Sequence, residues 1–173
     1  MTKKEVQQRV LQNGKPLPLD KFEWDEKTKT FSSNEDGLVL DFAGISNCTF
    51  NTLGGCTFNT LGGCTFKTGD GCTFNTLGGC TFDTGWSCTF VTGDRCTFVT
   101  GWGCTFKTGE KCVVVRRDVY EVIELSEGKK IRLNEYGVKG YKVLVKKPKK
   151  VVLTMDEIAE KFGIDVKNLK IKK

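Results

Sequence analysis

The chain has 173 residues, with 27 Lys and Arg against 21 Asp and Glu, no His and a net charge of +6. It lacks the side chain that most often moves protons near neutral pH, and it contains no P-loop, nucleophile elbow or dinucleotide fingerprint. We therefore expect a protein that is not an enzyme and that needs no cofactor.

No apolar run reaches the roughly 20 residues of a membrane span, and the polar start MTKKEVQQRV is unlike a signal peptide. These features indicate a soluble cytosolic protein, in which thiols stay reduced. The basic excess is local. Residues 1–47 and 48–112 have net charges of −1 and 0, whereas residues 113–173 carry 16 Lys and Arg against 9 Asp and Glu, a net charge of +7.

Residues 1–47 are predicted to form a helix followed by a β cap. Thr2 and Glu5 make a capping box and Gly14 supplies a stop, which predicts a helix over residues 2–13. The Pro-containing stretch 15–18 reads as an extended linker. Alternating apolar residues between turn signals predict strands over residues 22–24, 28–32 and 38–42.

Residues 48–112 hold the most informative pattern of the chain, a cysteine at every eighth position. Each of the first eight cysteines opens an octad of the form C-T-F-x-T-x-x-x. A strict short period is typical of a solenoid, in which each unit buries its apolar face against its neighbours. The cysteines are Cys48, Cys56, Cys64, Cys72, Cys80, Cys88, Cys96, Cys104 and Cys112.

The alternation of side chains along a strand predicts which octad positions face inward. The fourth position holds residues such as Lys67 and Asp83 and must face water, together with the Thr at position two. Cys, Phe and the second Thr then face the interior, and the fifth-position Thr is followed by three turn residues. We expect two ladders of Phe with Cys as a small filler beside them.

The spacing of rare residues predicts 16 residues per coil. Trp86 and Trp102 are 16 apart, and so are Asp94 and Glu110. One octad gives only about 26 Å of chain, too little to enclose Phe between two sheets. A coil of 24 residues would align Trp86 with Glu110. We therefore expect a mainly β fold, an octapeptide-repeat β-solenoid with two strands and two turns per coil in two sheets.

Residues 113–145 lose the repeat and are predicted to form a C-terminal β cap, because open solenoid edges template aggregation. Strands are expected over residues 119–125, 130–133 and 141–145. Residues 146–173 read as a basic linker with a small αβ tail. Thr154 and Glu157 form a capping box, Gly163 ends the helix, and residues 168–172 alternate like a strand.

The octad C-T-F-x-T-G-x-x resembles the repeats of small β-solenoid proteins encoded in bacteriophage and prophage genomes, and so do the flanks 21–42 and 112–125. The resemblance implies the solenoid fold and a place in the bacterial cytoplasm or in a virion, but no function. Leu53, Leu61 and Leu77 depart from the pattern, in three identical CTFNTLGG copies. Recent duplication and engineering both explain these copies. The Gly usual at this sixth position is expected to need a positive φ.

Two features of the repeat suggest a ligand. Stacked thiols suit zinc or copper(I), but the spacing is unlike that of zinc sites and no His assists, so we expect structural cysteines and no metal. The outward Thr columns resemble those of ice-binding β-solenoids, although their partner column mixes Asn, Lys, Asp and Val. Ice binding stays an alternative hypothesis.

Trp86 and Trp102 are expected to stack at one corner and, with Val91 and Val99, to form a surface for a protein partner. A sugar is a further possible ligand of the Trp pair. The Val faces also suggest a lateral homodimer as the alternative to a monomer.

The basic end suggests a nucleic-acid contact through Lys146, Lys147, Lys149 and Lys150. Residues 158–164, IAEKFGI, resemble the first half of a helix-turn-helix and also half of a LysM sugar-binding module. The preferred hypothesis is a non-catalytic structural or protein-interaction module, phage-related by resemblance. Nucleic-acid binding through residues 113–173 and ice binding are the alternatives.

Overall fold

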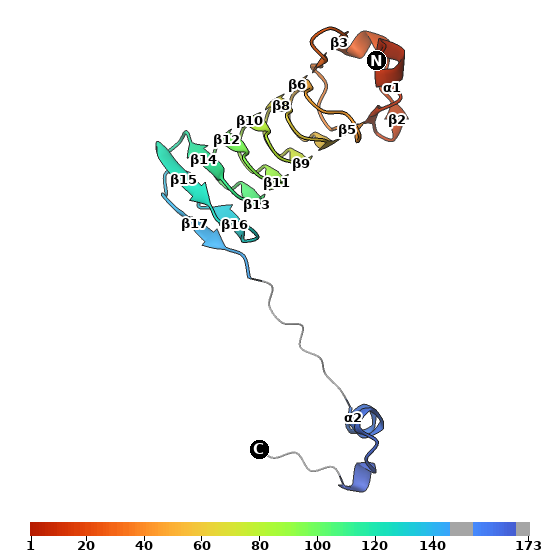
Figure 1. Ribbon diagram of the computed structural model, residues 1–173, viewed down its shortest axis with the longest axis vertical. Coiled ribbons are helices and arrows are strands. Elements are labelled where there is room, and N and C mark those ends of the chain that lie inside the picture. Colours follow the sequence, from red (N-terminus) through yellow and green to blue (C-terminus); the bar gives the residue numbers. More distant parts are fainter. Residues whose placement is uncertain (146–153, 169–173) are drawn as a thin grey trace.

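The computed structural model describes residues 1–145 and 154–168. Within them the chain is mainly β and winds into a β-solenoid of about five coils (Figure 1). Successive octads alternate between two sheets. The nine-stranded sheet has the order β17 (Tyr141–Val143), β16 (Lys130–Leu133), β13 (Thr105–Lys107), β11 (Thr89–Val91), β9 (Thr73–Asn75), β7 (Thr57–Thr60), β5 (Leu38–Phe42), β1 (Val10–Gln12) and β2 (Lys15–Pro16).

The eight-stranded sheet has the order β15 (Glu121–Leu125), β14 (Cys112–Arg116), β12 (Thr97–Thr100), β10 (Thr81–Asp83), β8 (Thr65–Lys67), β6 (Thr49–Asn51), β4 (Thr30–Ser32) and β3 (Glu23–Asp25). Neighbouring repeat strands are parallel and in register. Phe50 lies beside Phe66, and Phe66 beside Phe82. The coil of 16 residues is therefore confirmed, with two strands and two turns in each coil.

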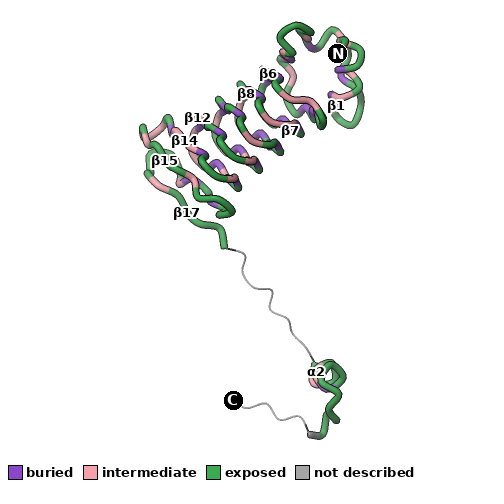
Figure 2. The backbone as a smooth tube through the Cα atoms, in the orientation of Figure 1, coloured by how far each residue is buried: buried purple, intermediate pink, exposed green. Residues whose placement is uncertain are grey.

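The interior is filled by the residues that strand alternation assigned to it. All nine Cys and all eight repeat Phe are buried, and buried segments line the inside of each coil (Figure 2). Along one sheet Phe66 and Phe82 stack at 4.8 Å and 4°, whereas across the interior Phe66 and Phe74 meet edge-on at 5.2 Å and 72°. Burying each Phe contributes about 1.5–3 kcal/mol, and each aromatic pair adds about 0.5–1.5 kcal/mol.

The left-handed turn residue stands at position eight of the octad, so the expectation of a positive φ at position six is wrong. Gly55 and Gly79 have φ of 67° and 70°, and Arg95 adopts 56° at the same position. The sixth-position Gly93 is short of space instead, since an added Cβ would lie 2.8 Å from the nitrogen of Gly78. Leu53, Leu61 and Leu77 therefore require no left-handed backbone.

The N-terminal helix is shorter than predicted. The expected capping box of Thr2 and Glu5 is present, but α1 covers only Lys3–Gln7. Residues 10–12 form β1, which pairs antiparallel with β5. Residues 15–16 are likewise a strand rather than a free linker, because β2 returns on β1 through the Asn13-Gly14 turn.

The strands of the N-terminal cap already belong to the solenoid. Strands β4 and β5 pair parallel with β6 and β7, so the first coil begins before Cys48. Strand β3 folds back antiparallel on β4 and follows a short 3₁₀ helix, Leu19–Lys21. Phe31 and Phe42 are fully buried. Phe31 lies beside Phe50 in register, whereas Leu40 takes the place beside Phe58 and Phe42 packs edge-on against Phe50 at 5.0 Å.

The C-terminal cap covers the last coil as expected. Strand β15 turns back antiparallel on β14, and β16 adds antiparallel to β13. Two of its strands are shorter than predicted, since β15 begins at Glu121 and β17 ends at Val143. Helix α2 (Met155–Phe162) has the predicted capping box and ends at Gly163, whose φ is 63°. The predicted strand over 168–172 is wrong at its first residue, because Asn168 ends a 3₁₀ helix, and residues 169–172 lie outside the described residues.

Candidate functional site

The tryptophan corner, Trp86 and Trp102, is the aromatic feature of the solenoid surface. The two residues occupy the same turn in successive coils, and their rings stack at 5.0 Å and 4°. Asp70 fixes this turn from the coil before, because its Oδ1 accepts the backbone N–H of Trp86 at 3.0 Å. Trp86 remains 45% exposed. The predicted stack is confirmed, and it lies on a turn that the neighbouring coils hold rigid.

The two valines that we grouped with this corner do not share one face. Val91 ends β11 in the nine-stranded sheet, whereas Val99 lies in β12 of the eight-stranded sheet. Val91 is 44% exposed and Val99 is half-buried. The candidate surface of Trp86, Trp102, Val91 and Val99 is therefore not a single patch.

The thiols of the cysteine ladder donate hydrogen bonds to backbone carbonyls of the solenoid turns. The Cys88 thiol donates to the carbonyl of Trp86 and to that of Gly69 in the preceding coil, both at 3.7 Å. The contact with the Cys104 thiol, together with burial, raises the pKa of Cys88 to about 11. Burial likewise raises the pKa of Cys112. A raised pKa keeps the Cys88 and Cys112 thiols protonated near neutral pH, and protonated thiols are poor nucleophiles and poor metal ligands.

The described residues contain no group of three or more His, Cys, Asp or Glu side chains that could hold a metal ion. The chemistry of the ladder agrees with this, because each described repeat thiol lies in the apolar interior among Phe rings.

The threonine columns divide as strand alternation predicts. The second Thr of the octad is buried in every repeat except at Thr68, and most of these hydroxyls bond to their own turn, as in Thr100, which donates to the Gly101 carbonyl at 3.2 Å. The buried hydroxyl of Thr84 has no hydrogen-bond partner among the described residues. The first Thr faces outward, beside a column of mixed residues. Asn75 donates to Asn59 at 3.4 Å, and Asn59 donates to Asp41 at 3.1 Å. Ice binding by these columns stays a prediction.

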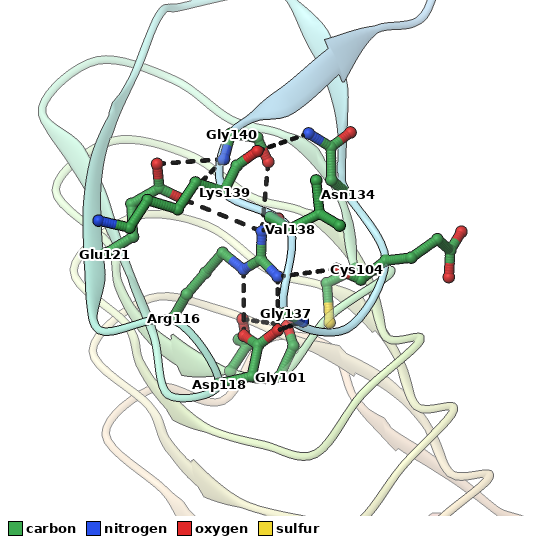
Figure 3. A network of polar contacts seen from close by, with 12 residues as sticks. Gly101, Cys104, Arg116, Asp118, Glu121, Asn134, Gly137, Val138, Lys139 and Gly140 are labelled. Atoms are coloured by element: carbon green, nitrogen blue, oxygen red, sulfur yellow. Dashed lines mark hydrogen bonds and ion pairs between the residues drawn. The ribbon is translucent and has the colours of Figure 1, made fainter.

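A buried arginine in the C-terminal cap was not singled out in the sequence. Arg116 is fully buried and donates to the Val138 carbonyl at 2.6 Å and to the Gly140 carbonyl at 3.3 Å (Figure 3). Asp118 binds its guanidinium and also accepts the N–H of Gly137 at 3.1 Å. Glu121 accepts the N–H of Gly140 at 2.8 Å. The alternation of side chains along the strand could have identified this residue, because Arg116 follows Cys112 and Val114 at inward-facing positions of β14.

These contacts assign a structural role to the Arg116 network. The guanidinium is surrounded by one close carboxylate and by carbonyls of the 134–140 loop, so it holds that loop over the end of the solenoid. Arg117 reinforces the cap from outside. It forms an ion pair with Asp83 and donates to the Thr84 carbonyl at 3.0 Å, two coils back.

The predicted basic contact at Lys146, Lys147, Lys149 and Lys150 lies outside the described residues. Helix α2 is described, and Phe162 at its end and Ile164 just after it are 67% and 46% exposed. The turn after it leads into the 3₁₀ helix Val166–Asn168, and residues 169–173 lie outside the described residues, so the resemblance to a helix-turn-helix is not tested. The resemblance to half of a LysM module stays equally untested.

No described helix is long and apolar enough to cross a membrane. Comparison of this chain with protein-family models, with curated proteins and with solved structures finds no match.

Proposed function

We propose that this protein is a non-catalytic scaffold, a rigid β-solenoid that presents fixed surfaces to a protein partner. The observation that carries the proposal is the contrast between the interior and the tryptophan corner. The repeat places thiols and most inner Thr hydroxyls in hydrogen bonds to its own turns, as for Cys88 and Thr100, and leaves Trp86 exposed on the surface.

The carboxylates beside the hollow at the N-terminal cap support a non-catalytic role. This open hollow of about 540 Å³ is lined by Glu5 and Asp41 among others. The Glu5 carboxylate accepts the N–H of Thr2, which lowers its pKa. Asp41 accepts from the amide of Asn59 and from the N–H of Ala43. Both acids are thus engaged in structural hydrogen bonds rather than held ready for proton transfer.

The tryptophan corner fits a docking point because Trp is enriched among the residues that dominate protein interfaces. The corner is ordered before any partner arrives, since Asp70 holds the Trp86 backbone and Trp102 packs on its ring. A preordered aromatic surface loses little conformational entropy on binding. The octad resemblance suggests that the partner is a phage protein or a protein of the infected bacterium.

The proposal is tested by affinity capture with the full chain as bait, in lysates of infected and of uninfected bacteria. The variant W86S/W102S removes the corner, and Y120S/Y136S, at two exposed aromatic residues of the C-terminal cap, serves as the control. We expect a protein that the wild type and the control retain and that W86S/W102S loses. Identical retention by all three baits would exclude the corner as the docking point.

A further inference from the structure

Four cations gather on the outer side of the nine-stranded sheet, where the C-terminal cap joins the last coil. Strand register places Lys107 opposite Lys130 and Arg132 opposite Lys142, and all four side chains are exposed. Their neighbours in the strands, such as Phe106 and Ile131, face the core. We name these four residues the basic face.

The basic face is electrostatically unfavourable in the free protein. Like charges directly opposite each other on neighbouring strands destabilise a sheet. Among the ion pairs of the described residues, the basic face takes part in one, from Arg132 to the exposed Glu135 at 3.9 Å. A long contact between two exposed groups offsets little of the repulsion. A bound polyanion would neutralise it.

The basic face adjoins aromatic and apolar groups. Gly103 follows Trp102 directly, and the guanidinium of Arg132 lies 3.9 Å from the position that a Cβ on Gly103 would take. Val91 lies beside Lys107 in the next strand of the same sheet. The cations are therefore flanked by the tryptophan corner on one side and by an exposed Val on the other.

We propose that the basic face binds single-stranded nucleic acid, with phosphates on its cations and bases against the tryptophan corner and Val91. A flat, exposed surface does not enclose a free phosphate, so its affinity must come from several contacts along one polymer. Proteins that hold single strands combine such cations with aromatic groups on which unpaired bases stack. Paired bases are already stacked within a duplex and cannot use the corner in this way.

This binding shares the tryptophan corner with the protein partner proposed above, but its test uses the purified chain alone and does not depend on that partner. Its test measures the fluorescence anisotropy of a labelled oligothymidylate of about 15 nucleotides, titrated with the full-length chain at several salt concentrations. The variant K107Q/K130Q/R132Q removes three cations of the basic face. The control K15Q/K27Q/K67Q makes the same change of net charge at exposed residues elsewhere. Both variants keep the basic residues after position 145.

We expect the control to bind like the wild type and the basic-face variant to bind about tenfold or more weakly at low salt. Loss of three phosphate contacts should also lower the slope of log affinity against log salt by about 2. The variant W86S/W102S should weaken binding while leaving that slope unchanged. Equal binding by both glutamine variants, no binding by the wild type at low salt, or tighter binding of a duplex of equal length would each overturn the proposal.

Discussion

The guanidinium of Arg116 is joined to the carboxylate of Asp118 by two hydrogen bonds, 3.2 Å from Nε and 2.6 Å from Nη2, and both side chains are buried. Breaking a buried pair by removing one partner leaves an uncompensated charge and costs about 3–5 kcal/mol. We expect Arg116→Met to lower the free energy of unfolding by about this amount, measured by urea denaturation. Exposed Arg95 provides the control, since Arg95→Met should change the free energy of unfolding by less than about 0.5 kcal/mol.

The same pair predicts a pH dependence of stability. Burial opposes ionisation of Asp118, but hydrogen bonds from Arg116 and from the N–H of Gly137 lower its pKa below the usual value. A lowered carboxyl pKa stabilises the folded state above the unfolded value of about 4 and loses that effect as the pH falls through the folded value. The destabilisation by Asp118→Asn should therefore be largest above pH 4 and shrink in more acidic solution. A difference between wild type and variant that does not change with pH would contradict this assignment.

Phe82 lies inside the ladder of the eight-stranded sheet, stacked between Phe66 and Phe98 at 4.8 Å on each side. Truncation to Ala should lower the free energy of unfolding by about 3–5 kcal/mol, because it leaves a cavity in a closely packed column. Phe82→Leu should cost less, since most of the volume is kept. Guanidinium denaturation of the three proteins measures both effects, and equal costs would argue against a packed column.

The thiols should resist alkylation in the folded protein. All nine are buried, which keeps a reagent away from the sulfur atoms, and in Cys88 the pKa is also raised to about 11. We expect iodoacetamide to label the native chain far more slowly than the chain unfolded in guanidinium. Mass spectrometry at successive times counts the labels. Rapid labelling of most thiols in the native state would show that Cys does not point inward.

Gly78 and Gly79 occupy adjacent turn positions but are required for different reasons. A Cβ on Gly78 would lie 2.6 Å from the carbonyl oxygen of Asp94, whereas on Gly79 the nearest atom is 3.8 Å away and only its φ of 70° is unfavourable. Gly79→Ala should cost about 1–2 kcal/mol for the left-handed backbone. Gly78→Ala should cost more, because the next coil must move. Thermal unfolding of the two variants compares them directly, and the reverse order would refute this account.

The length of the repeat and the octad positions that face inward could be predicted from the sequence, because both follow from a local alternation that recurs in every octad. The elements that we misassigned depend on contacts far away in the chain. Val10 and Leu11 fit a helical stripe, yet β1 forms because β5, nearly thirty residues later, offers it an antiparallel partner. Local capping signals fixed where α1 begins but not where the neighbouring sheet ends it.

In the C-terminal cap, the contacts of side chains also depend on residues that are distant along the chain. The inward position of Arg116 follows from parity, but the carbonyls that solvate it come from the 134–140 loop and could not be assigned from the sequence. The basic face was likewise invisible, because Lys107 and Lys130 meet only when β16 adds antiparallel to β13. Val91 and Val99 were grouped by chemistry, although the predicted alternation of octads between two sheets already separates residues that are eight apart.

Alternation between two sheets also constrains how the length of this chain can change. Insertion or deletion of a single octad would reverse the sheet on which each later strand lies, so β14 and the cap that follows it would meet the wrong neighbours. A change of two octads preserves every later assignment and moves the two ends apart or together by about 4.8 Å. Only even increments are neutral for the architecture, which makes the distance between the two ends a quantity that evolution or design can adjust in fixed steps.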